Sequence, residues 1–199
     1  MSAEEIKQDC ETKAFTRLAG RIKKRFPRLP ILLLADSLYA SKPVMDLCRE
    51  YKWEFLIRYK KGSIPSIAEE YEKIPEKGKT EKAEFVNDID YDGKPVHVLR
   101  YREEKAGETT EFQWLSSIRI TKGNAEKMAE TGRKRWKIEN EGFNRQKNWQ
   151  GSITHTCSWD DQAQKNHYLM AQISDFVKQL YEYYYLEKNG IKRSKKYIF

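Results

Sequence analysis

The sequence predicts an α/β fold with an antiparallel β insertion and a C-terminal helical region. Three observations lead to this fold class: an early strand–helix–strand pattern, a loop-rich stretch with three further strand patterns, and helical periodicity in the last third. We divide the 199 residues into four parts: an α/β part at 1–59, the β insertion at 60–119, a helix that returns to the α/β part at 120–147, and a C-terminal helix with a basic tail at 148–199.

The α/β part is expected to hold a helix followed by a crossover unit. Apolar residues recur at helical spacing over 15–26, and Pro27 ends that helix. The apolar run from Pro30 to Asp36 is typical of a strand that is buried on both faces of a parallel sheet. A helix capped by Ser41 and a second strand at 53–59 complete a right-handed strand–helix–strand unit.

The residue composition of the chain changes between residues 60 and 119. Gly and Pro interrupt a loop-rich stretch around one short helix at 67–71. Three strands are predicted at 83–89, 96–102 and 109–118, with turns at Asp92-Gly93 and Ala106-Gly107. We interpret this stretch as an antiparallel insertion that interrupts the α/β domain.

Two helices are predicted in the remainder. Asn124 is expected to cap a long helix that carries the block from Arg135 to Glu139. A last helix is predicted from about Asp160 to Leu186. It is amphipathic, with an apolar stripe made of Ala163, Leu169, Ile173, Phe176, Leu180 and Tyr184.

The composition indicates a folded protein with an anionic partner. The aromatic fraction of 13% argues against disorder, although 34% of the residues are charged. A net charge of +8 favours nucleic acid over membrane as the partner. The positive charges form three blocks, at 21–28, 133–137 and 188–196. For the first and last blocks, a solvated helix face or a disordered tail is an equally good explanation.

Cysteine usage and hydropathy indicate a cytoplasmic protein. Cys10, Cys48 and Cys157 have neither paired nor metal-ligand spacing, which is typical of free thiols in a reducing compartment. The sequence shows no signal peptide and no apolar run long enough to span a bilayer, so no membrane partner is expected.

Two carboxylates stand out as candidate metal ligands. Asp36 follows a buried strand, and ligands of α/β sheets gather at the carboxyl ends of strands. Glu139 shares a helix face with Arg135, four residues earlier. Carboxylates brought together from distant parts of a sequence hold divalent metals in nucleases. Each also has a structural explanation: Asp36 in an Asx-type turn with Ser37, and Glu139 in a surface ion pair worth about 0.2–0.5 kcal/mol.

The block Arg135-Trp136-Lys137-Ile138-Glu139, followed by Phe143 and a downstream lysine, resembles the signature of bacterial insertion-sequence transposases of the DDE type. In their IS-four-like branch the signature is Tyr, two residues, Arg, three residues, Glu, six residues, Lys. Arg135 and Glu139 occupy the Arg and catalytic Glu positions. The segment 35–40 is similar to the one around the second catalytic Asp of that family, and the branch carries a β insertion between this Asp and the Glu.

The resemblance implies an RNase H-like fold and a two-metal mechanism. Three carboxylates hold two Mg²⁺ (or Mn²⁺) ions, which activate water or a 3′-hydroxyl for attack on a phosphodiester. Asp36 and Glu139 would be catalytic and metal-binding. The residues that would bind DNA are Arg133, Arg135, Lys137, Lys147 and Trp114. For Trp114 the implied role is stacking on a flipped base, and packing in the core of the insertion is as good an explanation.

The chain departs from the family pattern at three points. The family Tyr position falls on Gly132, and the family Lys position falls on Gln146, with Lys147 adjacent. In the family fold the first catalytic Asp lies on the first of three strands that precede the helix predicted at 9–26, where the chain has no room for them. We therefore expect a partial RNase H-like fold lacking the first three strands, as in the C-terminal portion of a transposase.

These departures define the expected function and its alternatives. The chain is expected to bind transposon-end DNA and to be inactive alone. Its expected partners are DNA, a separately encoded N-terminal portion and a second copy of itself.

The alternative is a transposase-derived DNA-binding or regulatory protein without chemistry. An independent Mg²⁺ nuclease would need a further carboxylate, and Glu141 lies on a different helix face from Glu139. The strand at 30–35 is expected to leave an apolar edge open.

Overall fold

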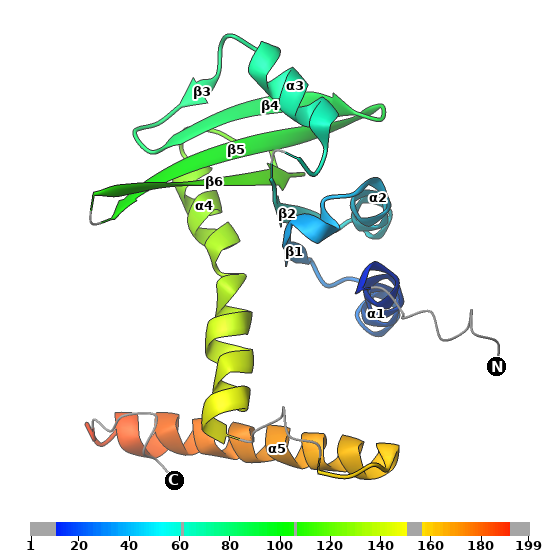
Figure 1. Cartoon of the computed structure of the whole chain (residues 1–199), viewed down its shortest axis with the longest axis vertical. Helices are drawn as coiled ribbons and strands as arrows, with labels where there is room; N and C mark the ends of the chain where they lie inside the picture. The colour runs from blue at the N-terminus through cyan, green and yellow to red at the C-terminus, as the bar shows by residue number, and fades with distance from the viewer. Residues whose placement is uncertain (1–10, 61, 106, 151–156, 192–199) are drawn as a thin grey trace, which may run out of the picture. The chain divides into compact units, whose positions relative to one another are not determined.

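The computed structural model describes residues 11–60, 62–105, 107–150 and 157–191. The chain divides into two compact units, Met1–Arg135 and Trp136–Phe199. The first unit is built on a β-sheet with helices on both faces, and the described part of the second unit is helical (Figure 1). None of the described helices is long and apolar enough to cross a membrane.

The first unit alternates strands and helices before the sheet becomes a meander. Its elements in chain order are α1 (Glu11–Arg25), β1 (Leu32–Ala35), the 3₁₀ turn η1 (Ser37–Tyr39), α2 (Lys42–Tyr51), β2 (Glu54–Arg58), α3 (Pro65–Lys73), β3 (Gly78–Lys79), β4 (Ala83–Tyr91), β5 (Lys94–Lys105), β6 (Glu108–Ser116) and α4 (Ala125–Arg133). The second unit contains the π-helical segments η2 (Ile138–Phe143) and η3 (Gln146–Gln150), the helix α5 (Asp161–Tyr181) and a last π-helical segment, η4 (Glu182–Glu187).

A single six-stranded sheet runs through the first unit in the order β1-β2-β6-β5-β4-β3. β1 and β2 are parallel, as the predicted crossover unit requires, and the other pairs are antiparallel. This mixed α/β architecture is consistent with a partial RNase H-like fold. The three predicted strands of the insertion and the turn at Asp92-Gly93 are confirmed, Ala106 of the second predicted turn lies outside the described residues, and the short β3 was not predicted. The insertion is not a separate sheet, because β6 pairs directly with β2, with Ile57 opposite Leu115.

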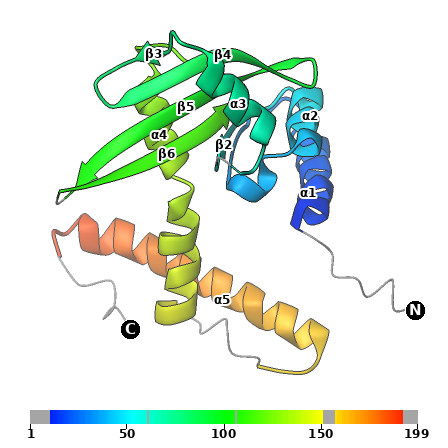
Figure 2. The same ribbon diagram turned by 45° about the horizontal axis from the view of Figure 1, so that its top comes forward.

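The two faces of the sheet bury two different cores. One face carries Phe55, Ile57 and Leu115, which pack with α1, α2 and α3. The other face carries Leu56, Leu99 and Trp114, which pack with α4. Alternate residues of a strand point to opposite faces, so neighbouring residues of β2 belong to different cores. α3 and α4 lie on opposite sides of the sheet in Figures 1 and 2, and α1 lies beside α2 in Figure 2.

Strand β1 lies at the edge of the sheet, with β2 as its partner within the described part of the chain, which agrees with the expected open edge. The burial of its faces differs from the prediction, because Ala35 is buried but Leu32 is exposed. Leu18, Phe26 and Leu29 are exposed as well. A run of apolar residues is common to buried strands and to edge strands that await a partner, and periodicity cannot separate the two.

The helix predicted to run from Asn124 through Glu139 is interrupted. α4 ends at Arg133, and Lys134 and Arg135 form a turn before the chain becomes helical again. Gly132, a poor helix former, lies in the last turn of α4. The spacing of Arg135 and Glu139 predicted that they share one face of a continuous α-helix. In the structure Arg135 lies in the turn and Glu139 lies in the π-helical segment η2.

The predicted C-terminal helix is confirmed and begins with a side-chain cap. Asp160 accepts a hydrogen bond from the Ala163 N–H at 2.7 Å. Its apolar stripe is exposed, with Ile173 at 57% and Phe176 at 62% of full accessibility. Its polar residues instead contact the preceding helical segment: Arg145 forms ion pairs with Asp175 at 3.1 Å and Glu182 at 3.3 Å.

Cys48 and Cys157 are free thiols, as predicted. Cys48 is buried in the core beneath α2, and burial raises the pKa of its thiol to about 11. Cys10 and most of the third basic block, residues 192–196, lie outside the described residues.

Candidate functional site

Asp36 stands directly after the last residue of β1, at the carboxyl end of the strand. Its backbone is extended, and its Oδ1 accepts a hydrogen bond from the Leu38 N–H at 3.0 Å. This is the Asx-type turn that the sequence offered as the structural explanation of Asp36. The turn uses one carboxylate oxygen and fixes the side chain, which is half-buried. The turn is therefore compatible with metal binding through the second oxygen.

Glu139 lies in η2, in the second unit, and its side chain is exposed. The π-helical geometry of η2 arises from i to i+5 hydrogen bonding and changes which residues share a face. Asp36 and Glu139 belong to different units, so their pairing stays a prediction.

Carboxylate oxygens are the ligands that Mg²⁺ prefers, so Asp36 and Glu139 are chemically suited to the metals of the family. Within the described ranges, however, no three His, Cys, Asp or Glu side chains come close enough to hold a metal ion.

The predicted DNA-binding residues lie on both sides of the unit boundary. Arg133, at the end of α4, is half-buried, forms an ion pair with Glu103 and lies 4.5 Å over the Phe112 ring. Arg135 is half-buried in the following turn. In the second unit Lys137 is exposed and approaches Glu141 at 3.7 Å, and Lys147 is exposed. The structure places each of these residues without showing what it binds.

Gln146, which the sequence resemblance aligned with the Lys of the branch signature, takes part in a helix contact. Its Nε2 donates to Oε1 of Gln172 in α5 at 2.8 Å. A residue held in this way is poorly placed for a phosphate contact, which leaves the adjacent, exposed Lys147 as the candidate.

Trp114 is buried, with 2% of its surface exposed, in the core between the sheet and α4. Gly132 lies against its indole ring: a Cβ built on Gly132 would stand 2.5 Å from Trp114 Nε1. A side chain at position 132 would therefore collide with the indole ring unless one of the two moved. In this structure Trp114 packs in the core, and stacking on a base would require its ring to leave this contact.

Sequence reasoning missed two residues of this region, Arg58 and Phe112. Arg58 is the last residue of β2 and pairs in register with Trp114 of β6. Its guanidinium lies 4.7 Å over the ring of Phe112 and 5.3 Å over that of Trp114. Burial, and then the charges of Arg133 and Arg135, lower the pKa of Arg58. Only the pairing of β2 with β6 brings these residues together, and no local sequence signal reveals that pairing.

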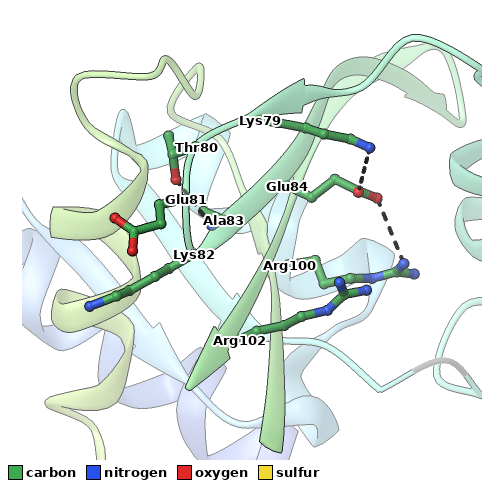
Figure 3. A pocket seen from close by; sticks show the side chains of 8 residues that line it. All are labelled: Lys79, Thr80, Glu81, Lys82, Ala83, Glu84, Arg100 and Arg102. Atoms are coloured by element: carbon green, nitrogen blue, oxygen red, sulfur yellow. Dashed lines mark hydrogen bonds and ion pairs between the residues drawn. The ribbon is translucent and has the colours of Figure 1, made fainter. Parts of the chain in front are cut away.

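A second group of charged residues, on β3, β4 and β5, lines a pocket (Figure 3). At its centre Arg100 approaches Glu72 at 3.1 Å, Glu111 at 3.3 Å and Glu84 at 3.8 Å. The dashed lines of Figure 3 show Glu84 between Lys79 and Arg100. Because carboxylates surround Arg100, this network neutralises its own charge and holds α3 on the sheet.

The comparisons with known proteins identify the family. A family model described as "Transposase DDE domain" matches residues 8–172, which is most of the chain. A search of curated proteins found no match. The matched segment includes Asp36, the six-stranded sheet, Arg135 and Glu139. The chain therefore belongs to the transposase DDE domain family, which supports a role in DNA transposition.

Proposed function

We propose that this chain contributes Asp36 and Glu139 to the two-metal site of a DDE transposase, binds transposon-end DNA and does not cut or join DNA alone. The observation that carries the proposal is the position of Asp36 in a transposase DDE domain: it is fixed at the carboxyl end of β1, the edge strand of the sheet in the described part of the chain. In this reading the chain resembles the C-terminal portion of an enzyme of the IS-four-like branch.

The open edge of β1 supports a partner that completes the sheet. Among the described residues only β2 pairs with β1, so a further strand aligned along β1 would satisfy its remaining backbone groups and would cover Leu32. A carboxylate on that strand would lie near Asp36, at the same edge of the sheet. The third carboxylate of the site would then come from that strand.

The basic residues support the DNA-binding part of the proposal. Arg133, Arg135, Lys137 and Lys147 would contact phosphates, and the net charge of +8 would draw DNA to the protein. A homodimer that brings two transposon ends together is part of the same proposal.

A second candidate function is a DNA-binding or regulatory protein without chemistry. Two observations favour it, and the first is that no three metal-binding side chains gather into a site within the described residues. Gln146 at the family Lys position points the same way, because its hydrogen bond with Gln172 is a packing contact.

Plasmid cleavage separates the two functions. The purified chain with Mg²⁺ or Mn²⁺ should bind DNA and leave it uncut. Co-expression with the polypeptide encoded directly upstream, if it supplies three strands and an Asp, should restore cleavage. Asp36→Ala and Glu139→Ala should each abolish this activity.

The matched control is Glu141→Ala, which removes a carboxylate from the same helical segment and should leave cleavage intact. Cleavage by the chain alone that Asp36→Ala abolishes would contradict the claim that the chain is inactive by itself. DNA binding without cleavage in the presence of the upstream polypeptide would support the function without chemistry.

A further inference from the structure

Three arginines gather where β2, β6 and α4 of the first unit meet. Arg58 and Arg133 lie over the same Phe112 ring, at 4.7 Å and 4.5 Å from its centre. Their charges and that of Arg135 are close enough for the pKa of Arg58 to fall, after the larger effect of burial. The residues come from three elements and meet only in the folded unit.

The hydrogen bonds of Arg58 leave part of its donor capacity unused. Nη1 donates to the Gln113 carbonyl at 3.4 Å and Nη2 to the Glu111 carbonyl at 3.3 Å. A guanidinium has five N–H donors, and those two acceptors are neutral. Arg58 thus has a fixed position on the aromatic rings, and its charge is not neutralised by a direct ion pair among the described residues.

The neighbouring carboxylates are engaged with other cations. Glu111 is shared by Arg100 at 3.3 Å and Arg102 at 3.3 Å, and Glu103 pairs with Arg133. The contrast with Arg100 is direct, because three carboxylates lie within 4 Å of that guanidinium. Arg58 therefore differs from Arg100: the charges of Arg133 and Arg135 act on Arg58, which has no direct ion pair among the described residues, whereas carboxylates surround Arg100.

We propose that Arg58, held on Phe112 beside Arg133, is a DNA-backbone contact that binds a phosphodiester group. Stacking on an aromatic ring orients a guanidinium and lowers the entropy lost when it binds, and its planar fork matches two phosphate oxygens. A phosphate would also relieve the repulsion among the arginines. This inference rests on the proposed DNA binding and adds Arg58 of β2, with the supporting ring of Phe112 of β6, to the DNA-binding surface.

The test is DNA retention by the full chain across a range of salt concentrations. Arg58→Gln should weaken binding of a duplex roughly tenfold at low salt. It should also reduce the slope of log affinity against log salt by about 0.9, the value for one phosphate contact. Arg119→Gln is the matched control, since it removes one positive charge from an exposed arginine that pairs with Asp88. It should leave the slope unchanged.

Two further variants separate phosphate binding from a role in folding. Arg58→Lys keeps the charge and loses the planar fork, so it should recover the slope but only part of the affinity. Phe112→Leu leaves the charges in place and removes the ring, so it should weaken binding by itself. Thermal melts of all variants check folding. If one of Arg58→Gln, Arg58→Lys and Phe112→Leu does not fold, the DNA binding of the other two tests the phosphate contact.

The outcomes distinguish this inference from the proposed function. If the wild-type chain binds no DNA at low salt, both proposals are wrong. If the wild-type chain binds DNA but folded Arg58 and Phe112 variants bind as tightly as Arg119→Gln, with the same slope, only the phosphate contact is wrong.

Discussion

The two units use their apolar residues in opposite ways. The first unit buries Phe55, Ile57 and Leu115 completely between its sheet and its helices. In the described part of the second unit, only Lys178 and Leu186 are buried, and the apolar stripe of α5 is exposed. There the helices contact each other through polar groups, such as Arg145 with Asp175 and Gln146 with Gln172. The hydrophobic effect thus stabilises the first unit far more than the second.

The largest expected difference is between two phenylalanines. Phe55→Ala should destabilise the first unit by about 3–5 kcal/mol, because it leaves a cavity in a fully packed core. Phe176→Ala, in α5, should change stability by about 0.5 kcal/mol or less, because the ring is already exposed. Urea unfolding followed by tryptophan fluorescence measures both. A large loss of stability in Phe176→Ala would show that the stripe of α5 is covered in solution.

The same contrast shows what the sequence could predict. The strands β4, β5 and β6 followed from alternation and from turns such as Asp92-Gly93, whose positive φ angles of 57° and 73° fit a hairpin turn. The stripe of α5 also followed from periodicity, which reports that a face is apolar but not whether anything covers it.

The pairing of strands that are distant in the sequence could not be predicted from local patterns. The pairing of β2 with β6 joins residues about sixty positions apart, and local patterns carry no information about it. The position of Arg58 on Phe112 depends on that pairing, so this cluster was missed. Asp36 was predicted because its signal is local: a strand followed by a turn-forming acid. The break at Lys134 was missed because helical spacing continues through it in the sequence.

Two glycines give the next test, one in each unit. Gly132→Ala should destabilise the first unit by about 1–3 kcal/mol, because the new Cβ would overlap the Trp114 ring. Gly142→Ala should instead stabilise its helical segment by up to about 1 kcal/mol, since nothing lies within 4 Å of the new Cβ. Thermal melts of the two variants should shift in opposite directions.

The cause of the Gly132 effect can be checked with a double variant. If the cost is the overlap with the indole ring, Gly132→Ala should cost less in a Trp114→Leu background than in the wild-type chain. Equal costs in the two backgrounds would assign the effect to the backbone of α4 instead.

The smallest effect is a pH dependence that belongs to the first unit. Burial lowers the pKa of His97 below its ordinary value near 6.5, and the Asp88 N–H donates to its Nδ1 at 3.1 Å, which requires that nitrogen to be unprotonated. The charges around the ring oppose each other: Asp88 and Glu54 raise this pKa, and Arg119 lowers it. The unfolded chain therefore binds the proton more readily than the folded chain.

The contribution of neutral His97 to stability is complete above pH 6.5 and is lost as the pH falls from there toward the folded-state pKa. Melting temperatures at pH 7.5 and 5.5 should differ less in His97→Asn, which keeps an acceptor for the Asp88 N–H but does not titrate, than in the wild-type chain. His167→Asn, at an exposed site in α5, should leave the difference unchanged. A wild-type pH dependence retained in full by His97→Asn would place its origin in other groups.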